Sequence, residues 1–91
     1  MTFDLERPWR VGSQVALRPE PFGALAYHFG TRRLSFLKTK KLVTVVEGLG
    51  EHPTARAACA AASVTAGELP AYERALDTLA ASGMIVEQAS R

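Results

Sequence analysis

The sequence predicts an α+β fold in which a three-stranded antiparallel sheet is followed by a three-helix bundle, in a winged-helix-like arrangement. Apolar side chains alternate along short runs between residues 14 and 37, which is typical of strands. After Leu37 they recur every three to four residues, which is typical of helices. The 91 residues suit one domain, so we expect a single domain over residues 1–91, with its core at 11–87 and frayed ends.

Three strands are expected, at Val15–Arg18, Ala24–Phe29 and Arg33–Leu37. Residues 19–23 hold two prolines, which cannot donate ladder hydrogen bonds, and residues 30–32 start with a glycine, so both breaks favour hairpin turns. The larger apolar side chains of the last two strands occupy alternate positions, namely Leu25, Tyr27, Phe29, Leu34 and Phe36. We expect this apolar face to pack inward, with His28 on the opposite face.

Three helices follow the strands. The first begins near Thr39, a suitable N-cap, and ends by Gly48 or Gly50. Its apolar stripe consists of Leu42, Val45, Val46 and Leu49. The second has Pro53 in its first turn and a face of small side chains. The third begins around Pro70 and is closed by Gly83, after which residues 84–86 fold back onto the core.

Composition favours a cytoplasmic protein that does not enter membranes. No apolar run approaches the ~18 residues that a membrane span needs, and the N-terminus lacks a signal-peptide pattern. Cys59 is the single cysteine, so it forms no internal disulfide, and we expect it to be a small buried side chain.

The motifs of common enzymes are missing from the sequence. It contains no glycine-rich phosphate loop, no Gly-x-Ser-x-Gly elbow and no His-Glu-x-x-His motif. His28 and His52, the two histidines, have no metal-binding partners at suitable spacing. The acids Glu68, Glu73 and Asp77 suit a solvated helix face better than a catalytic pair. We therefore expect no catalytic residue, no metal and no cofactor.

The charges are unevenly distributed. Residues 1–50 carry eight basic and four acidic groups, whereas residues 51–91 carry three and five. The basic cluster at Arg32, Arg33, Lys38, Lys40 and Lys41 suits either an acidic partner or a solvated edge. A winged-helix-like nucleic-acid-binding protein is one alternative. It is disfavoured because one candidate recognition helix has almost no side chains to read bases and the other is acidic near its start.

Two segments carry a resemblance to a known family. The ending Leu76-x-x-Leu79-x-x-x-Gly83-Met84-Ile85, with the strand at residues 33–37 and the helix at 42–49, resembles the precursor-peptide-recognition family typified by the pyrroloquinoline quinone peptide chaperone. The run from Val15 to Gly30, followed by residues 32–37, is more specific and resembles the peptide chaperones of the mycofactocin system. The resemblance covers roughly residues 11–87.

This resemblance implies a peptide recognition element with no catalysis of its own. It implies two partners: a ribosomally made precursor peptide, and a radical S-adenosylmethionine maturase that holds the iron–sulfur clusters. The leader of the peptide would add as an extra strand beside the third strand, in the groove between that strand and the third helix. The implied peptide-binding residues are Arg32, Arg33, Leu34, Ser35, Phe36, Leu37, Tyr72, Ala75, Leu76 and Leu79.

Some alternatives stay open at this point. Leu34, Phe36, Leu76 and Leu79 suit a core role at least as well as ligand contact. The chain also suits an enzyme-only adaptor subunit that forms a homodimer through the edge of the third strand. Trp9 and Phe22 lie outside the expected sheet, and the sequence does not decide whether they cap the core or touch a partner.

Overall fold

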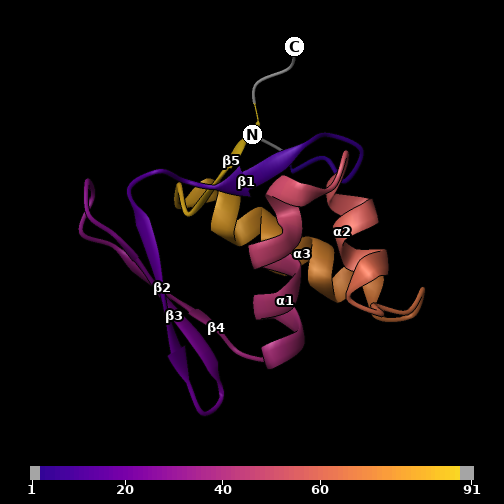
Figure 1. Ribbon diagram of the computed structural model, residues 1–91, viewed down its shortest axis with the longest axis horizontal. Helices are drawn as coiled ribbons and strands as arrows, with labels where there is room; N and C mark the ends of the chain where they lie inside the picture. The colour runs from indigo at the N-terminus through magenta and orange to yellow at the C-terminus, as the bar shows by residue number, and fades with distance from the viewer. Residues whose placement is uncertain (1–2, 89–91) are drawn as a thin grey trace.

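The computed structural model describes residues 3–88, which form five strands and three α-helices (Figure 1). The ends at residues 1–2 and 89–91, where the sequence predicts fraying, lie outside the described residues. The elements in chain order are β1 (Trp9–Val11), β2 (Val15–Glu20), β3 (Gly23–His28), β4 (Leu34–Leu37), α1 (Lys40–Gly48), the 3-10 turn η1 (Leu49–Glu51), α2 (Ala55–Ala61), α3 (Leu69–Ala81) and β5 (Ile85–Glu87).

The strands form two antiparallel sheets. One has the order β2-β3-β4, and the other pairs β1 with β5. The α+β fold with a three-stranded sheet followed by three helices is therefore confirmed. In Figure 1 this sheet lies on one side of the molecule, with α1 beside it and α2 on the opposite side. The β1–β5 pair was not predicted as a sheet, because three-residue strands are too short to show alternation.

The prediction of which sheet face packs inward was wrong. Ala24, Ala26 and Leu37 are buried, whereas Leu34 and Phe36 are 59% and 60% exposed. Paired residues in a sheet share a face, and Leu25 pairs with Phe36 as Tyr27 does with Leu34. The large side chains therefore face outward. The inner face, which packs against the helices, carries small alanines. His28 was predicted on the face opposite the large side chains, and it lies there, half-buried on the inner face.

Local capping fixes the helix boundaries much as the sequence predicts. The Thr39 hydroxyl accepts a hydrogen bond from the Leu42 N–H at 3.0 Å, which confirms Thr39 as the N-cap of α1. Gly83, at φ 79°, follows α3 as the predicted left-handed residue. Pro53 is a difference, because it precedes α2, whose N-cap is Thr54.

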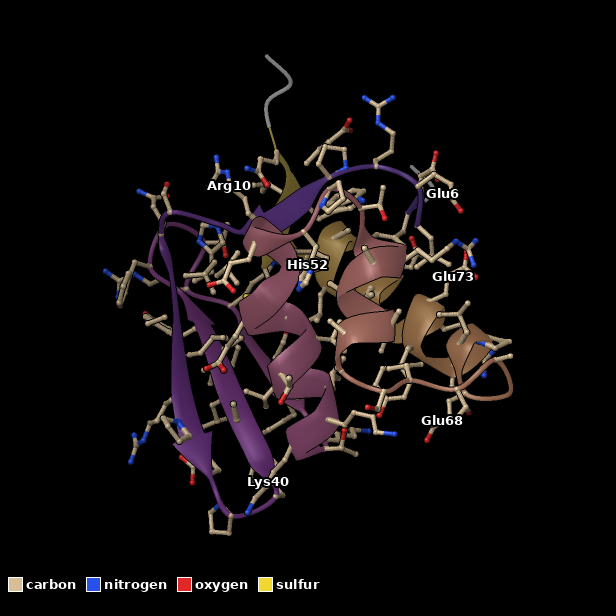
Figure 2. The ribbon with its side chains drawn as sticks, turned by 45° about the vertical axis from the view of Figure 1, so that its right-hand side comes forward. Glu6, Arg10, Lys40, His52, Glu68 and Glu73 are labelled. Atoms are coloured by element: carbon tan, nitrogen blue, oxygen red, sulfur yellow. The ribbon has the colours of Figure 1, made fainter. Side chains whose placement is uncertain are left out.

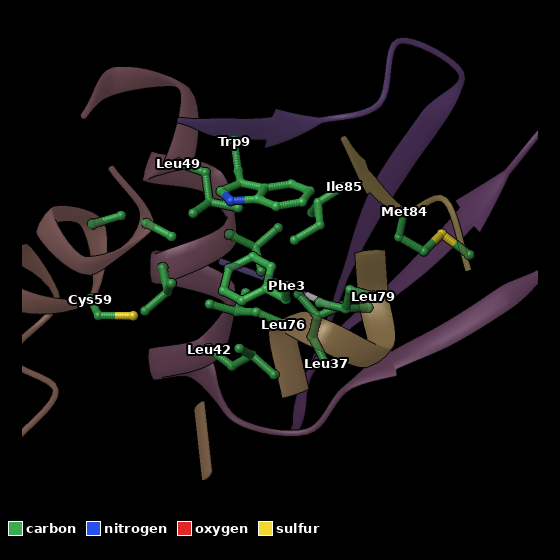
Figure 3. Packing of buried hydrophobic residues seen from close by; sticks show 14 of the residues in the cluster. Phe3, Trp9, Leu37, Leu42, Leu49, Cys59, Leu76, Leu79, Met84 and Ile85 are labelled. Carbon is green, nitrogen blue, oxygen red and sulfur yellow. The ribbon is translucent and has the colours of Figure 1, made fainter. Parts of the chain in front are cut away.

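The core extends farther toward the N-terminus than residue 11. Phe3, Leu5 and Trp9 are buried, and the Phe3 and Trp9 rings lie 4.7 Å apart between centroids. Figure 3 shows both rings in one cluster with Leu76. The backbone of Phe3 donates to the Asp77 carboxylate at 3.0 Å, so this acid anchors the N-terminal segment to α3. Trp9 is thus a core residue within β1, which resolves the alternative left open by the sequence.

Candidate functional site

The β4 strand is at one edge of its sheet. In an antiparallel pair, residues alternate between those whose backbone groups bond the partner strand and those whose groups point away. The His28 N–H donates to the Arg33 carbonyl at 2.9 Å, so Arg33 bonds β3, and by alternation Ser35 and Leu37 do too. The backbone groups of Leu34 and Phe36 point away from β3. Within residues 3–88 no strand pairs with β4 on that side, so these groups form the open β4 edge.

The other edge of the sheet, at β2, is different. The Phe29 N–H donates to the Gln14 carbonyl at 2.8 Å, and continuing this alternation places Ala16, Arg18 and Glu20 in hydrogen-bonded pairs with β3. Pro19 therefore occupies a position that points away from β3, where its missing N–H breaks no ladder bond. A proline at this place blunts the β2 edge against a further strand.

A groove lies beside the open β4 edge, between β4 and α3. It consists of two adjoining hollows of about 360 and 170 Å³ that share Lys38, Leu42 and Ala75. The other lining residues are Ser35, Phe36, Thr39, Ala71, Tyr72, Thr78 and Leu79. The small Ala71 and Ala75 side chains keep the helix surface low here, and Leu42 supplies an apolar floor from α1.

Half of the ten predicted peptide-binding residues line this groove. They are Ser35, Phe36, Tyr72, Ala75 and Leu79. Leu37 and Leu76 do not line it, because both are fully buried in the core. Figure 3 shows Leu37 and Leu76 inside the hydrophobic cluster. Leu34 projects from the outer face, while its backbone still lies on the β4 edge.

Arg32 and Arg33 lie in the turn between β3 and β4. The Arg32 N–H donates to the His28 carbonyl, and the Arg33 carbonyl accepts the His28 N–H. Arg32 and Arg33 therefore both lie opposite His28, which is the geometry of a β-bulge. Arg32 has φ 62°, a left-handed conformation in which non-glycine residues are uncommon. The Nδ1 atom of His28 accepts hydrogen bonds from the Gly30 and Thr31 N–H groups at 3.0 and 3.1 Å. His28 therefore shapes the turn that leads into β4.

Sequence reasoning missed several lining residues. Leu42 was assigned only to the core stripe, and Ala71, Thr39 and Thr78 were not considered for the site. Lys38 was assigned only to the basic cluster. A groove wall formed by residues from three elements has no local signature, so only the packing of α1 and α3 against β4 brings these residues together.

One ion pair organises the start of α3 near the groove. The Glu68 carboxylate accepts the Thr65 N–H and the Lys41 ammonium, both at 3.0 Å, while the Thr65 hydroxyl accepts the Glu68 N–H at 3.2 Å. This reciprocal arrangement is a capping box. The bond from the Thr65 backbone, followed by that from Lys41, lowers the pKa of Glu68 below its ordinary value. Glu68 thus serves helix α3, and Figure 2 shows it near the start of that helix.

The side chains of residues 3–88 that could hold a metal ion or act as a nucleophile are dispersed or buried. Among residues 3–88, no three His, Cys, Asp or Glu side chains gather where they could hold a metal ion. Cys59 is buried, as predicted, and burial raises the pKa of its thiol, with a smaller opposing effect from Arg56. A buried thiol of raised pKa is a poor nucleophile. Over the same described range, no helix is long and apolar enough to cross a membrane.

Known proteins similar to this chain share one description. Residues 8–86 match the model of the Peptide chaperone MftB family. The Peptide chaperone MftB of Mycobacterium ulcerans (strain Agy99) is 56% identical over 86 residues, which cover 94% of this chain and 79% of the relative. The chain belongs to the MftB peptide chaperone family. The expected resemblance is thereby confirmed.

Two further MftB relatives agree. The Peptide chaperone MftB of Mycolicibacterium smegmatis (strain ATCC 700084 / mc(2)155) is 54% identical over 86 residues, covering 94% of this chain and 84% of the relative. The Peptide chaperone MftB of Mycobacterium tuberculosis (strain ATCC 25618 / H37Rv) is 52% identical over 84 residues, covering 92% of this chain and 77% of the relative. No solved structure matches the chain. The residues matched by the MftB family model include all of β4 and α3, and hence both walls of the groove.

Proposed function

We propose that this MftB-family protein is a non-catalytic peptide chaperone of the mycofactocin type. It binds the leader of a ribosomally made precursor peptide by strand addition at the β4 edge and presents that peptide to a radical S-adenosylmethionine maturase. The observation that carries the proposal is the open β4 edge beside an apolar groove. An unpaired strand edge offers backbone donors and acceptors to an extended peptide, and an adjoining groove receives its side chains.

The difference between the two sheet edges supports β4 as the binding edge. Pro19 blunts β2, whereas Leu34 and Phe36 each offer an N–H and a carbonyl on the open side of β4. Most sheet edges are protected against pairing with other chains, so an unprotected edge is a feature to be explained. Pairing with a leader strand explains it.

The groove supports selectivity for part of the leader. Successive residues of an added strand point to opposite sides, so every second leader side chain would face the hollows. Leu42, Ala75 and Leu79 would receive apolar leader side chains, and the Lys38 ammonium would attract leader carboxylates. Arg32 and Arg33, both exposed, would attract acidic leader residues beyond the end of β4. Exposed pairs of this kind contribute only ~0.2–1 kcal/mol each.

The mechanism of presentation is proximity. A chaperone that holds the leader while it contacts the maturase raises the effective concentration of the reacting end of the peptide at the active site. The chaperone needs no reactive group for this. The names of the relatives, which describe a chaperone, agree with that role.

Calorimetric titration with a synthetic mycofactocin-type precursor peptide tests the proposal. A Leu34→Pro variant loses one N–H of the β4 edge, whereas a Leu34→Ala variant loses the side chain and keeps the N–H. An unpaired backbone group costs about 1–3 kcal/mol, so Leu34→Pro should weaken binding by about 5- to 150-fold. Leu34→Ala should bind within about threefold of the wild type. Failure of the wild type to bind the peptide would refute the proposed function.

A further inference from the structure

The sheet presents a large apolar surface to solvent, of which the proposed peptide groove shares only Phe36. This outer face is formed by residues that pair side by side across the three strands: Ala16, Arg18, Leu25, Tyr27, Leu34 and Phe36. Phe22 and Phe29 extend it at the two hairpin ends and are 44% and 58% exposed. A monomeric protein seldom exposes this many large apolar side chains together, and such patches mark interaction sites.

The side chains of the outer face are arranged as an interface. The Phe22 and Phe36 rings meet edge to face at 6.1 Å, and Tyr27 meets Phe29 in the same way at 5.2 Å. Rings that hold one another in this way lose little further freedom when a partner covers them. Aromatic side chains of this kind are enriched at the centre of protein interfaces.

The charges around the outer face are almost all of one sign. Residues 13–37, which include β2, β3 and β4, hold three basic residues, Arg18, Arg32 and Arg33, and one acid, Glu20. The Glu20 carboxylate is bound to Arg18 at 3.2 Å and is 23% exposed, whereas the Arg18 side chain is 80% exposed. Arg32, at the β3–β4 turn, is exposed as well, whereas Arg33 pairs with His28 and so belongs to the opposite side of the sheet. The rim of the outer face is therefore positive.

We infer that the outer face is the docking surface for a protein partner whose contact surface is apolar at its centre and acidic at its rim. That partner is the maturase to which the peptide is presented, so the inference rests on the proposed function. Charge decides against a second copy of this chain. Two outer faces packed together would bring Arg18 and Arg32 of both copies near one another, and the Glu20 carboxylates there are already paired with Arg18.

The chemistry of the outer face also favours a protein over single-stranded nucleic acid. Nucleic-acid platforms offer free ring faces on which bases stack. Here Leu25 pairs with Phe36 and Leu34 pairs with Tyr27, so aliphatic side chains lie between the rings, and the rings are engaged with one another. A branched aliphatic centre between aromatic rings fits apolar protein side chains.

The outer face adjoins the peptide groove through β4. The Phe36 side chain stands on the outer face and also lines the groove, so a docked maturase would lie directly beside the bound leader. This position brings the peptide to the enzyme without a separate hinge or linker. Phe36 belongs to both surfaces and therefore cannot separate them in a test, whereas Leu25 and Tyr27 line only the outer face.

Binding of the purified mycofactocin maturase to the full chain tests the inference. A Leu25→Thr/Tyr27→Thr variant introduces β-branched side chains that suit a strand. It should lower affinity for the maturase at least tenfold, with peptide affinity unchanged within twofold. Arg18→Gln should lower the affinity for the maturase and make that affinity less dependent on salt concentration. The matched control Arg10→Gln removes the same charge from β1, on a different sheet (Figure 2). It should leave maturase binding and its salt dependence unchanged.

The possible failures are distinguishable. If the wild type binds no peptide, the proposed function fails. If it binds peptide while the double variant keeps full affinity for the maturase, or the wild type does not bind the maturase, only the inference fails. Sedimentation of the wild type as a dimer that the double variant dissociates would assign the outer face to a second copy. Binding of a 15-nucleotide oligo-dT strand, lost in that variant, would assign it to nucleic acid.

Discussion

The orientation of the sheet is tested by two leucines on the same short strand. Leu37 is fully buried on the inner face, whereas Leu34 is 59% exposed on the outer face. Burying a leucine side chain completely is worth about 1.5–3 kcal/mol, and about two-fifths of Leu34 is buried, so Leu34→Ala should cost about 0.6–1.2 kcal/mol. Leu37→Ala removes the same atoms from a closed core and adds a cavity, so it should cost about 2.7–5 kcal/mol.

Urea denaturation of both variants and the wild type, followed by circular dichroism, measures these costs. The two substitutions are chemically identical, so the free energy of unfolding should differ by about 2–4 kcal/mol between the variants, from the values above. The slope of unfolding free energy against urea should stay the same in all three proteins. Equal costs, or a larger cost at Leu34, would show that the sheet packs with its large side chains inward and would remove the basis for the outer face.

Three further predictions concern stability. The pKa of Glu68 is lowered in the folded chain, so its stabilising effect is present above the ordinary value of 4.5 and is lost as the pH falls through the folded pKa. The stability gap between the wild type and Glu68→Gln should therefore narrow below pH 4.5 in urea titrations, and a gap independent of pH would contradict this. His28→Ala removes an acceptor of two hydrogen bonds and should cost about 1–3 kcal/mol of unfolding free energy. His28→Asn, whose side-chain oxygen can take the place of Nδ1, should cost less; equal losses would refute the role of His28 in the turn. Ser63 has φ 68° after α2, so Ser63→Gly should raise the thermal midpoint by relieving about 1–2 kcal/mol of strain, against about 0.4–1 kcal/mol of added chain entropy. A lowered thermal midpoint would contradict the presence of backbone strain at Ser63.

Local signals in the sequence predicted most of the secondary structure. Thr39, Pro70 and Gly83 mark helix boundaries through capping or backbone geometry, which depend on a few neighbouring residues. The strands at β3 and β4 follow from alternation between turn residues, whereas β2 continues through Pro19 and Glu20, which the sequence assigned to a turn. These features need no knowledge of distant parts of the chain.

The inverted sheet faces show where that reasoning ends. Alternation identifies two faces, and a rule that favours larger apolar side chains selects the wrong one here. The inner face carries Ala24 and Ala26 because Leu42, Val45 and Val46 of α1 fill the space above them. Burial depends on the total volume that both elements supply, which the sequence of one strand does not reveal.

Only part of the candidate groove was predicted from the sequence, because its lining also depends on how separate elements pack together. The resemblance indicated the strand and helix that form the walls of this groove, and Ala75 and Leu79 are among its lining residues. Leu76 is one residue from Ala75, yet it points into the core, because neighbours on a helix are rotated by about 100°. The backbone groups that form the β4 edge depend on the register of β4 with β3 and on which pairs in that register are hydrogen-bonded, as the bond from His28 to Arg33 shows.

Amide hydrogen exchange at β4, followed by NMR, tests strand addition most directly. In the free protein the Leu34 and Phe36 amides should exchange quickly, while Ser35, bonded toward β3, is protected. Saturation with the precursor peptide should protect Leu34 and Phe36 and leave Leu17, on the β2 edge, unchanged. Protection at the β2 edge, or peptide binding that leaves Leu34 and Phe36 exchanging as before, would contradict strand addition at β4.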